Sequence, residues 1–335
     1  MKSPLTGKVM HLKNEKRNLV YRKEAFEVVY HFYLCAETDE QFTTAELDIL
    51  NLIQVHNQYR AKYGIPFIDE IKNIREKYGL SAAKMSEVLG LGANVYRHYE
   101  SGEIPSVATG RLIRLAEDPR EFQKLLEIGK NALNEREYEK VKKKIEHTMY
   151  GWHKVNKHIE QWLFGTKIPN VYTGFSIPNL HKTGKMVSFF AEKNQPFTTA
   201  LNKLMFYADF GHFKKYGVGI SGICYHALQK GPVPNNYGGI YNQLVNSGYI
   251  TIEEKGFKDF VGEMFHSTGE INVKATDEIL KPSEIEILNK VSNHFQGMNT
   301  KQIVEISHDE EAWKDNVDNY GMIDYLYSFK LKHFD

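Results

Sequence analysis

The first clear pattern along the chain is a run rich in β-branched and aromatic residues between Leu19 and Leu34. A polar break at Arg22-Lys23-Glu24 divides this run in two, which is typical of a β-hairpin. Thr43-Thr44-Ala45-Glu46 then has the spacing of a capping box ahead of apolar residues at helical intervals, and so predicts the start of a helix. Gly64-Ile65-Pro66 interrupts that helix, because proline disfavours helical backbone at the residue before it.

Helical spacing dominates the rest of the chain. Short amphipathic segments run from Phe67 to about Ala116, and charge-laced helical sequence continues to Trp162. We interpret the basic run at 140–144 within it as a solvated helix face or a linker. The stretch Gly165–Leu180 marks a domain boundary. A second compact unit follows, mostly helical with a small β element near Tyr249–Glu254.

The composition is that of a soluble globular protein, with 41% apolar and 25% charged residues among 335. Because the net charge is only +1, any DNA-binding surface must be a local patch. No apolar run is long enough to span a bilayer and Met1-Lys2-Ser3-Pro4 is not the start of a signal peptide, so we expect a cytoplasmic location and no membrane partner. Two cysteines, Cys35 and Cys224, are too few for a disulfide framework.

Residues 71–115 are the most informative stretch and predict a helix-turn-helix. Gly79 can end the first helix, Ser81 can begin the second at Ala82–Leu89, and Gly90 can supply the turn. A third short helix, about Ala93–Tyr99, then exposes polar side chains, as a recognition helix in the major groove requires. The candidate base-reading residues are Asn94, Arg97 and His98, and the candidate phosphate contacts are Lys84, Arg111 and Arg114, which could equally be ordinary exposed charges.

The residues at 100–106, Glu-Ser-Gly-Glu-Ile-Pro-Ser, resemble the tail of Xre-family regulators. Residues 1 to about 125 also resemble MqsA-type antitoxins, in which two Cys-x-x-Cys pairs bind structural zinc. This chain has Ser3-Pro4-Leu5-Thr6 and Cys35-Ala36-Glu37-Thr38 in their place. Since hydroxyls are poor substitutes for thiolates, we expect no metal and no cofactor, which elemental analysis of the purified protein can test.

The resemblance to MqsA-type antitoxins also implies two base-reading residues, an asparagine and an arginine four positions later. Asn94 matches the first of them. The second position falls on His98, with Arg97 beside it, so we expect the target DNA sequence to differ from that of the family.

Spaced blocks between Gly174 and Trp313 resemble the Panacea, or SocA-like, domain of many antitoxins. They include 173–180, the apolar segment 201–210, 220–234 and 307–313. The resemblance implies that this domain binds a cognate protein toxin while the helix-turn-helix binds operator DNA. It also implies assembly as a homodimer or as a toxin–antitoxin hetero-oligomer.

The candidate toxin-binding residues of this domain are Lys203, Tyr207, Asp209, Phe210, Gly231 and Pro232. Each also has a structural interpretation. The segment that carries the first four is apolar enough to be core, and a buried Asp209 would need hydrogen bonds or a cation such as Lys203 or Lys230. Gly231-Pro232-Val233-Pro234 forms a rigid turn, which could be a binding edge or simply a break between elements.

The sequence contains no motif typical of an enzyme. We find no Gly-rich phosphate loop, nucleophile elbow or paired zincin histidines, and His308-Asp309-Glu310-Glu311 lacks further ligands at a recognised spacing. Cys224 has no motif partner and is interpreted as a small core residue. We therefore expect no enzymatic activity.

The predicted fold is mainly α with small β elements, in four parts. These are a degenerate zinc-ribbon-like β module with a helix at 1–62, an all-helical Xre-type helix-turn-helix domain at 63–125, a helical connector at 126–165 and a mostly helical Panacea domain at 166–335. The expected function is that of a type II antitoxin that neutralises its toxin and represses its own operon. Two alternatives remain open, a stand-alone transcriptional regulator and a protease adaptor that uses the SocA-like domain for another protein partner.

Overall fold

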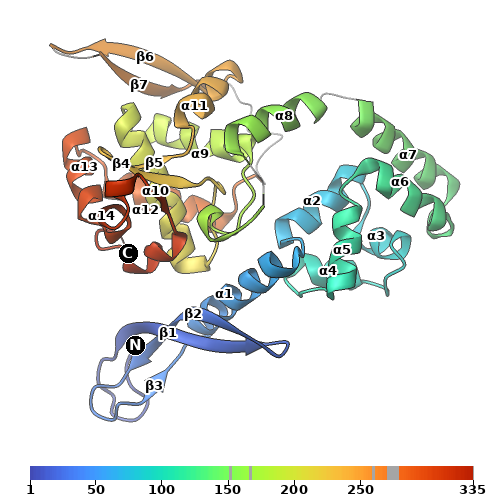
Figure 1. The fold of residues 1–335 in the computed structure, drawn as a ribbon, viewed down its shortest axis with the longest axis horizontal. Coiled ribbons are helices and arrows are strands. Elements are labelled where there is room, and N and C mark those ends of the chain that lie inside the picture. The colour runs from blue at the N-terminus through green and yellow to red at the C-terminus, as the bar shows by residue number, and fades with distance from the viewer. Residues whose placement is uncertain (151–152, 166–167, 259–260, 270–278, 335) are drawn as a thin grey trace. The chain divides into compact units, whose positions relative to one another are not determined.

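The computed structural model describes residues 1–150, 153–165, 168–258, 261–269 and 279–334. The predicted connector at 126–165 and the predicted Panacea region at 166–335 therefore each include a few residues outside this description. The chain divides into two compact units, one made of Met1–Gln54 and Glu160–Asp335 and the other of Val55–Ile159. Helices predominate and the sheets are small and antiparallel, so the predicted fold class is confirmed (Figure 1).

The first unit begins with a three-stranded sheet in which β1 (His11–Tyr21) pairs with β2 (Glu24–Leu34), and β2 pairs with β3 (Gln41–Phe42). The hairpin turn falls at Arg22 and Lys23, which both have the positive φ that a tight two-residue turn requires. β1 begins at His11, earlier than the predicted start at Leu19. Apart from Leu12, its first half is polar, and it stays exposed on both faces, so the hydrophobic pattern does not reveal it.

Helix α1 (Ala45–Tyr63) closes part of the other edge of β2 with two amide side chains. The Asn51 amide accepts from the His31 N–H at 2.8 Å and donates to the His31 carbonyl at 2.9 Å. The Gln54 amide does the same for Val29, at 3.0 and 2.9 Å. Both side chains are buried, so together they satisfy this strand edge as a neighbouring strand would.

The rest of the first unit is built around α10 (Thr198–Tyr216), a helix in which every residue from 200 to 213 is buried. A helix that is buried on every side belongs in a core rather than on a surface. The elements that contact it include α9 (Leu180–Lys193), β5 (Gly231–Pro234), β7 (Val261–Ser267), α12 (Pro282–His294) and α13 (Thr300–Asp309). This unit also contains the last residues of α8 (His153–Phe164), together with β4 (Tyr225–Leu228), α11 (Tyr237–Asn246), β6 (Ile250–Gly256), α14 (Glu311–Lys314), β8 (Met322–Ile323) and short 3-10 helices at Val171–Thr173, Val317–Asn319 and Tyr325–Lys330.

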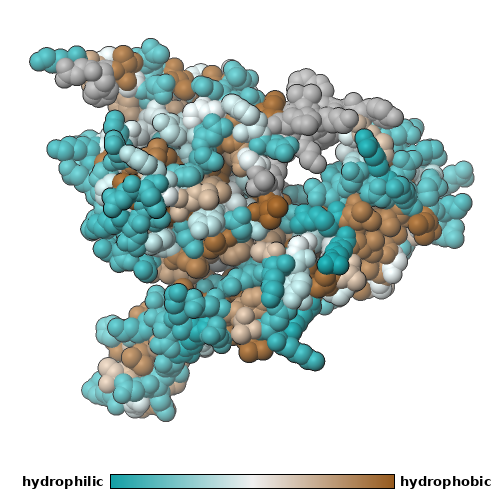
Figure 2. All heavy atoms as spheres, in the orientation of Figure 1, coloured by the Kyte–Doolittle hydropathy of each residue, from teal (hydrophilic) through white to brown (hydrophobic). Residues whose placement is uncertain are grey.

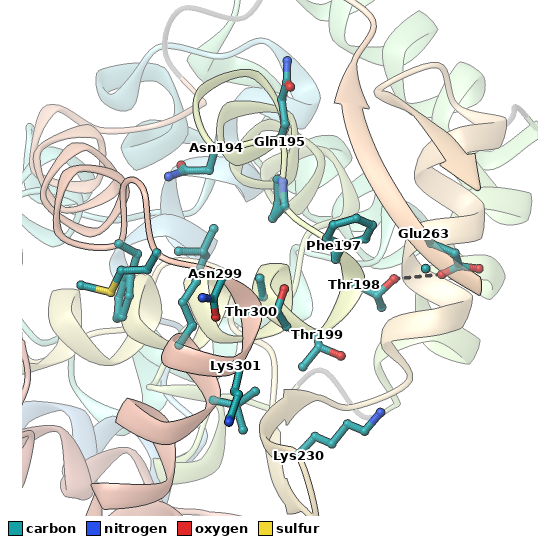
Figure 3. A pocket seen from close by; sticks show the side chains of 18 of the residues that line it. Asn194, Gln195, Phe197, Thr198, Thr199, Lys230, Glu263, Asn299, Thr300 and Lys301 are labelled. Carbon is teal, nitrogen blue, oxygen red and sulfur yellow. Dashed lines mark hydrogen bonds between the residues drawn. The ribbon is translucent and has the colours of Figure 1, made fainter. Parts of the chain in front are cut away.

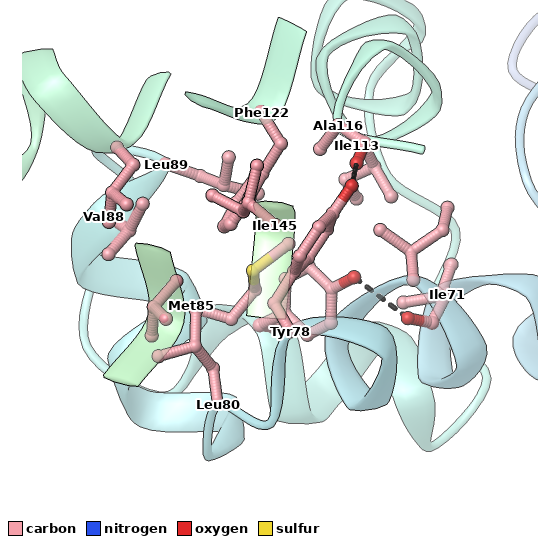
Figure 4. Close-up of a cluster of buried hydrophobic side chains, with 14 of the residues drawn as sticks. Ile71, Tyr78, Leu80, Met85, Val88, Leu89, Ile113, Ala116, Phe122 and Ile145 are labelled. Atoms are coloured by element: carbon pink, nitrogen blue, oxygen red, sulfur yellow. Dashed lines mark hydrogen bonds between the residues drawn. The ribbon is translucent and has the colours of Figure 1, made fainter. Parts of the chain in front are cut away.

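The second unit is all-helical, with α2 (Ile68–Tyr78), α3 (Ala82–Val88), α4 (Val95–Glu100), α5 (Val107–Leu115), α6 (Pro119–Ile128) and α7 (Glu135–Tyr150). These helices enclose one hydrophobic cluster, in which the Tyr78 ring stacks on Phe122 with the centroids 3.8 Å apart (Figure 4). Helix α7 contributes Val141 and Ile145 to the cluster. Much of the predicted connector is thus packed into the core of the helix-turn-helix unit.

Hydrophilic residues cover much of the face of the molecule shown in Figure 2, with hydrophobic patches between them. Among the described residues, no helix combines the length and the apolar character needed to cross a membrane.

Candidate nucleic-acid interface and interaction cleft

The turn between α3 and α4 is shaped by local backbone signals. The Ser81 hydroxyl caps α3 by accepting from the Lys84 N–H at 3.2 Å. Gly90 follows this helix with φ 67°, a conformation that glycine adopts without strain, and the next N–H, that of Leu91, donates to the Ser86 carbonyl at 2.8 Å. These features agree with the predicted positions of the second helix and of the turn.

Two buried hydrogen bonds and one partly buried ion pair hold α4 in place. The Ser86 hydroxyl accepts from the Tyr96 N–H at 2.9 Å, and the Tyr96 hydroxyl donates to the Ile71 carbonyl at 2.8 Å. Burial raises the pKa of Tyr96, so its hydroxyl remains a neutral donor. Arg75 in α2 lies 2.6 Å from the Glu100 carboxylate at the end of α4. Two helices therefore anchor one side of α4, as a recognition helix requires.

The opposite side of α4 is open to solvent. Asn94, Arg97 and His98 are all exposed, whereas Tyr96 and Tyr99 are buried. The helix begins at Val95 rather than near Ala93, because Asn94 has a left-handed backbone with φ 62° and precedes the first turn. The structure thus brings the three candidate base-reading residues together on one free surface.

The candidate phosphate contacts differ from one another. Lys84 lies 3.0 Å from the Glu87 carboxylate and donates to the Ala132 carbonyl at 2.8 Å. Arg114 pairs with Glu70 and lies 3.3 Å from Glu117. Arg111 is exposed on α5. Lys84 and Arg114 therefore already have intramolecular partners that a phosphate would have to replace.

Sequence reasoning missed a buried arginine that organises the loop after α4. Arg60 donates to the carbonyls of Pro66, Gly102 and Glu103 at 2.5 to 3.2 Å. These bonds satisfy one backbone carbonyl between α1 and α2 and two in the loop that follows the recognition helix. No local pattern marks Arg60 for this role, because its acceptors lie up to 43 positions away along the chain.

All six candidate toxin-binding residues are buried in this structure. Asp209 accepts hydrogen bonds from the N–H groups of Ile220 and Ser221 at 2.7 Å, from the Tyr225 hydroxyl at 2.7 Å, and from the Ser221 hydroxyl. Burial raises the pKa of Asp209, and these donors act in the opposite direction. Of the two possibilities left open for this carboxylate, the structure shows hydrogen bonds rather than a cation.

Four other members of the set also have structural contacts within the core. The Tyr207 hydroxyl donates to the buried Glu310 carboxylate at 3.1 Å, and the Phe210 ring stacks on Tyr325 with the centroids 4.4 Å apart. Gly231 has φ 98°, and a Cβ there would lie 2.7 Å from Cε of Lys203 and 2.5 Å from the Ser307 hydroxyl. Pro232 follows it in β5 and pairs with Ala227 of β4. As placed, none of these side chains offers surface to a partner.

Lys203 stands apart because its ammonium group has no hydrogen-bond acceptor among the described residues. The side chain is fully buried. Burial and, to a smaller extent, the charge of Lys230 together lower the pKa of Lys203 to about 7.

A cleft of about 1160 Å³ opens beside α10 (Figure 3). Three segments far apart in the sequence line it, namely residues 193–200, the β6–β7 hairpin and residues 295–304. Thr198 and Thr199 of α10 face it, and the Thr198 hydroxyl donates to the Glu263 carboxylate at 2.9 Å. Phe197 and Phe257 contribute apolar surface. The arrangement can hold a protruding group that has both apolar and polar contacts to make.

Comparison with family models identifies both halves of this architecture. Residues 71–118 match the helix-turn-helix model, and residues 201–314 match the model described as antitoxin SocA-like, Panacea domain. The chain carries a SocA-like Panacea domain. Both matched families are regulatory, and the resemblances drawn from the Xre-type tail and from the spaced C-terminal blocks are confirmed. Comparison with curated proteins and with solved structures found no match.

The cleft of the Panacea domain carries more positive than negative groups. Lys193, Lys230 and Lys301 line it, against Glu254 and Glu263. The buried Lys203 lies next to Gly231, which directly follows the cleft-lining Lys230. Sequence reasoning did not predict this cleft, although the starts of α10 and α13 at its rim are visible in the sequence as Thr198-Thr199 and as the Asn299 cap.

The N-terminal positions compared above with zinc ligands, Ser3, Thr6, Cys35 and Thr38, lie together. Cys35 is buried, and the Thr6 hydroxyl is 3.7 Å from its sulfur. Hydrogen bonds from Ser3, Thr38 and the Glu37 backbone lower the pKa of the Cys35 thiol to about 6. Among the described residues, no group of three or more His, Cys, Asp or Glu side chains is placed to hold a metal ion.

Proposed function

We propose that this protein is a type II antitoxin whose Panacea domain neutralises a protein toxin and whose helix-turn-helix represses the operon that encodes the pair. The observation that carries the proposal is the presence of a helix-turn-helix and a SocA-like Panacea domain in one chain. A DNA-binding element fused to an antitoxin domain couples expression of the pair to the amount of free toxin. The protein has no enzymatic role in this proposal.

The exposed side of α4 supports the DNA-binding part of the proposal. Asn94 can pair with adenine and Arg97 with guanine through two hydrogen bonds each, and His98 lies beside them. Arg111 is free to contact a phosphate, while Lys84 and Arg114 would have to exchange their intramolecular partners. A homodimer on a palindrome would place two such helices about one turn of DNA apart.

The cleft, rather than the buried set on α10, is the surface that we assign to the toxin. A protein partner needs exposed groups, and the cleft offers apolar walls with an excess of lysines. These features suit a partner that inserts an apolar side chain flanked by acidic residues. The six residues predicted from the sequence do not line this cleft and would then stabilise the core of the domain rather than touch the toxin.

The first test is a growth assay. The adjacent open reading frame is expressed from an inducible promoter, alone and together with this chain, and the two proteins are co-purified. Toxicity that this chain relieves, with a stable complex, is the expected result. A harmless neighbour that forms no complex would instead support a stand-alone regulator, and a partner whose half-life depends on this chain would support a protease adaptor.

A pair of matched variants tests the cleft in the same assay. Thr199→Arg places a long cation among the cleft-lining residues, whereas Thr251→Arg makes the same change at an exposed position of β6 that does not line the cleft. We expect Thr199→Arg to lose neutralisation while DNA binding is retained, and Thr251→Arg to behave as wild type. Equal neutralisation by both variants would remove the cleft from the toxin-binding surface.

A further inference from the structure

β1 has a free edge. In the part of the chain that the structure describes, β1 pairs with β2 alone. The far edge of β2 is occupied by β3 and by the amides of Asn51 and Gln54, so among the described strands of this sheet β1 presents a long open edge over residues 11–20. The unpaired N–H and C=O groups of such an edge can accept another strand.

The side chains along this edge are unusual for an unprotected strand. Leu12 and Val20 are 52% and 75% exposed. Their positions differ by an even number, so both side chains project from the same face of the sheet. Between them lie Asn14, Lys16 and Asn18 on that face, and on the other face Glu15 and Arg17 are neighbours that already pair at 2.6 Å.

We propose that β1 pairs antiparallel with β1 of a second copy of this chain, about a two-fold axis through Lys16. In that register Leu12 of one copy lies opposite Val20 of the other, Asn14 lies opposite Asn18, and Glu15 lies opposite Arg17, each twice because of the symmetry. Directly opposed residues of antiparallel strands are close enough for these apolar, amide and ionic contacts. The result is one continuous six-stranded sheet in which each β1 is paired on both of its edges.

Lys16 meets its own copy at the axis, which would be unfavourable without a counter-charge. The Lys16 ammonium lies 2.8 Å from the Glu27 carboxylate of the neighbouring strand β2. Each lysine therefore brings a carboxylate with it, so the centre of the joint sheet carries two ion pairs rather than two isolated cations.

The neighbouring registers are less favourable. An axis through Glu15 places two glutamates together and sets Lys13 opposite Arg17. An axis through Arg17 places two arginines together and sets Val20 opposite Asn14. Only the axis through Lys16 joins opposite charges while pairing the two exposed apolar residues, and like charges placed directly opposite each other destabilise a sheet.

The test is the molar mass of the full chain by light scattering across a range of concentrations. We expect wild type to show a dimer, and both Leu12→Glu and Val20→Lys to show the monomer mass, because each places a lone charge against an apolar residue. Mixing the two variants should restore a dimer, since one contact then joins the introduced glutamate to the introduced lysine and the other remains Leu12 against Val20. Leu5→Lys, at a residue that is 60% exposed outside β1, is the control and should remain a dimer.

Cross-linking tests the register. Lys16→Cys places a thiol on the two-fold axis, and mild oxidation should join two chains through it. Asn18→Cys, at the next position along the same face, has its counterpart several residues away and should not cross-link. A wild-type chain that remains monomeric at every concentration would overturn the proposal, as would a dimer that persists unchanged in Leu12→Glu and Val20→Lys.

Discussion

Two buried ionisable residues of α10 differ in how many hydrogen-bond partners the interior offers them. Asp209 has four hydrogen-bond donors from the segment 220–225, whereas Lys203 has no acceptor among the described residues. Four donors can offset the cost of removing a carboxylate from water, but for an ammonium without a partner nothing offsets that cost. Lys203 is therefore a source of instability rather than of stability.

Replacing Lys203 should stabilise the protein. The pKa of Lys203 is about 7 in the folded chain and 10.5 for an unperturbed lysine, so between these values the unfolded state binds the extra proton. On account of Lys203, the free energy of unfolding should rise as the pH increases from about 7 to 10.5. The destabilisation of the folded chain by the buried ammonium group should be largest below pH 7. Lys203→Met should raise the free energy of unfolding at pH 7 by about 1–4 kcal/mol and abolish that rise.

Urea denaturation at a series of pH values measures both effects. Lys301→Met is the matched control, because that side chain is 87% exposed and its removal should change neither quantity. A Lys203→Met variant that is less stable than wild type at pH 7 would mean that the ammonium has a partner in solution that stabilises it.

At the scale of single elements, α4 and α1 each use one side of the helix for contacts that the rest of the fold depends on. In α4 the fixed side is Tyr96 and Tyr99, and the free side carries Arg97 and His98, with Asn94 directly before the first turn. In α1 the fixed side is a pair of amides that complete a sheet. Both arrangements depend on helical spacing, which places residues three and four apart on one side of a helix.

Changes in the recognition helix should affect specificity rather than folding. Asn94→Ala should cost about 1–3 kcal/mol in operator binding and relax specificity at one base position, because the residue would lose a paired contact to a base edge. Arg111→Ala should weaken binding to all sequences alike and reduce its salt dependence. Titration of labelled operator and of scrambled DNA measures both.

Asn131→Ala serves as the matched control for DNA binding, because Asn131 is an exposed asparagine outside α4. Its affinity for operator should equal that of wild type. If Asn94→Ala also left affinity and specificity unchanged, Asn94 would have no part in reading the DNA.

The amide ladder between α1 and β2 should be important for stability. Gln54→Leu keeps the size of the side chain but leaves the N–H and C=O of Val29 without partners. Unsatisfied buried backbone groups of this kind cost about 1–3 kcal/mol, so the free energy of unfolding of the first unit should fall by about that amount. Gln161→Leu, at an exposed position of α8, is the control for the substitution itself.

At the scale of the whole molecule, the chain crosses between its two units twice, within α1 and within α8, so the second unit is an insertion in the sequence of the first. Each unit has its own buried core, one centred on α10 and the other on Tyr78 and Phe122. Separate cores can unfold separately, because the contacts that stabilise one do not stabilise the other.

Calorimetry should therefore show more than one unfolding transition. Ile113→Ala, at a fully buried position of the second unit, should cost about 2–5 kcal/mol and lower one transition. Leu244→Ala, equally buried in the first unit, should lower the other. A single transition that both variants shift by the same amount would show instead that the two units unfold together.

Local signals were enough to predict the helix-turn-helix, the hairpin turn and the apolar character of α10. The Ser81 cap, the positive φ of Gly90 and the turn at Arg22 and Lys23 each depend on a few neighbouring residues, so the sequence alone determines them. The spaced C-terminal blocks were likewise enough for the family of the domain. What they could not indicate was which of those residues remain accessible.

Accessibility was decided by tertiary structure. Tyr207 and Phe210 carry the chemistry of an interface, yet packing from every side leaves them without exposed surface. The cleft exists only because residues 193–200, the β6–β7 hairpin and residues 295–304 meet in space. The pairing of Gln54 with Val29 and of Arg60 with the loop after α4 also joins distant positions. Capping and turn formation are local events, whereas burial and partner choice depend on contacts across the fold, and no pattern within one segment encodes them.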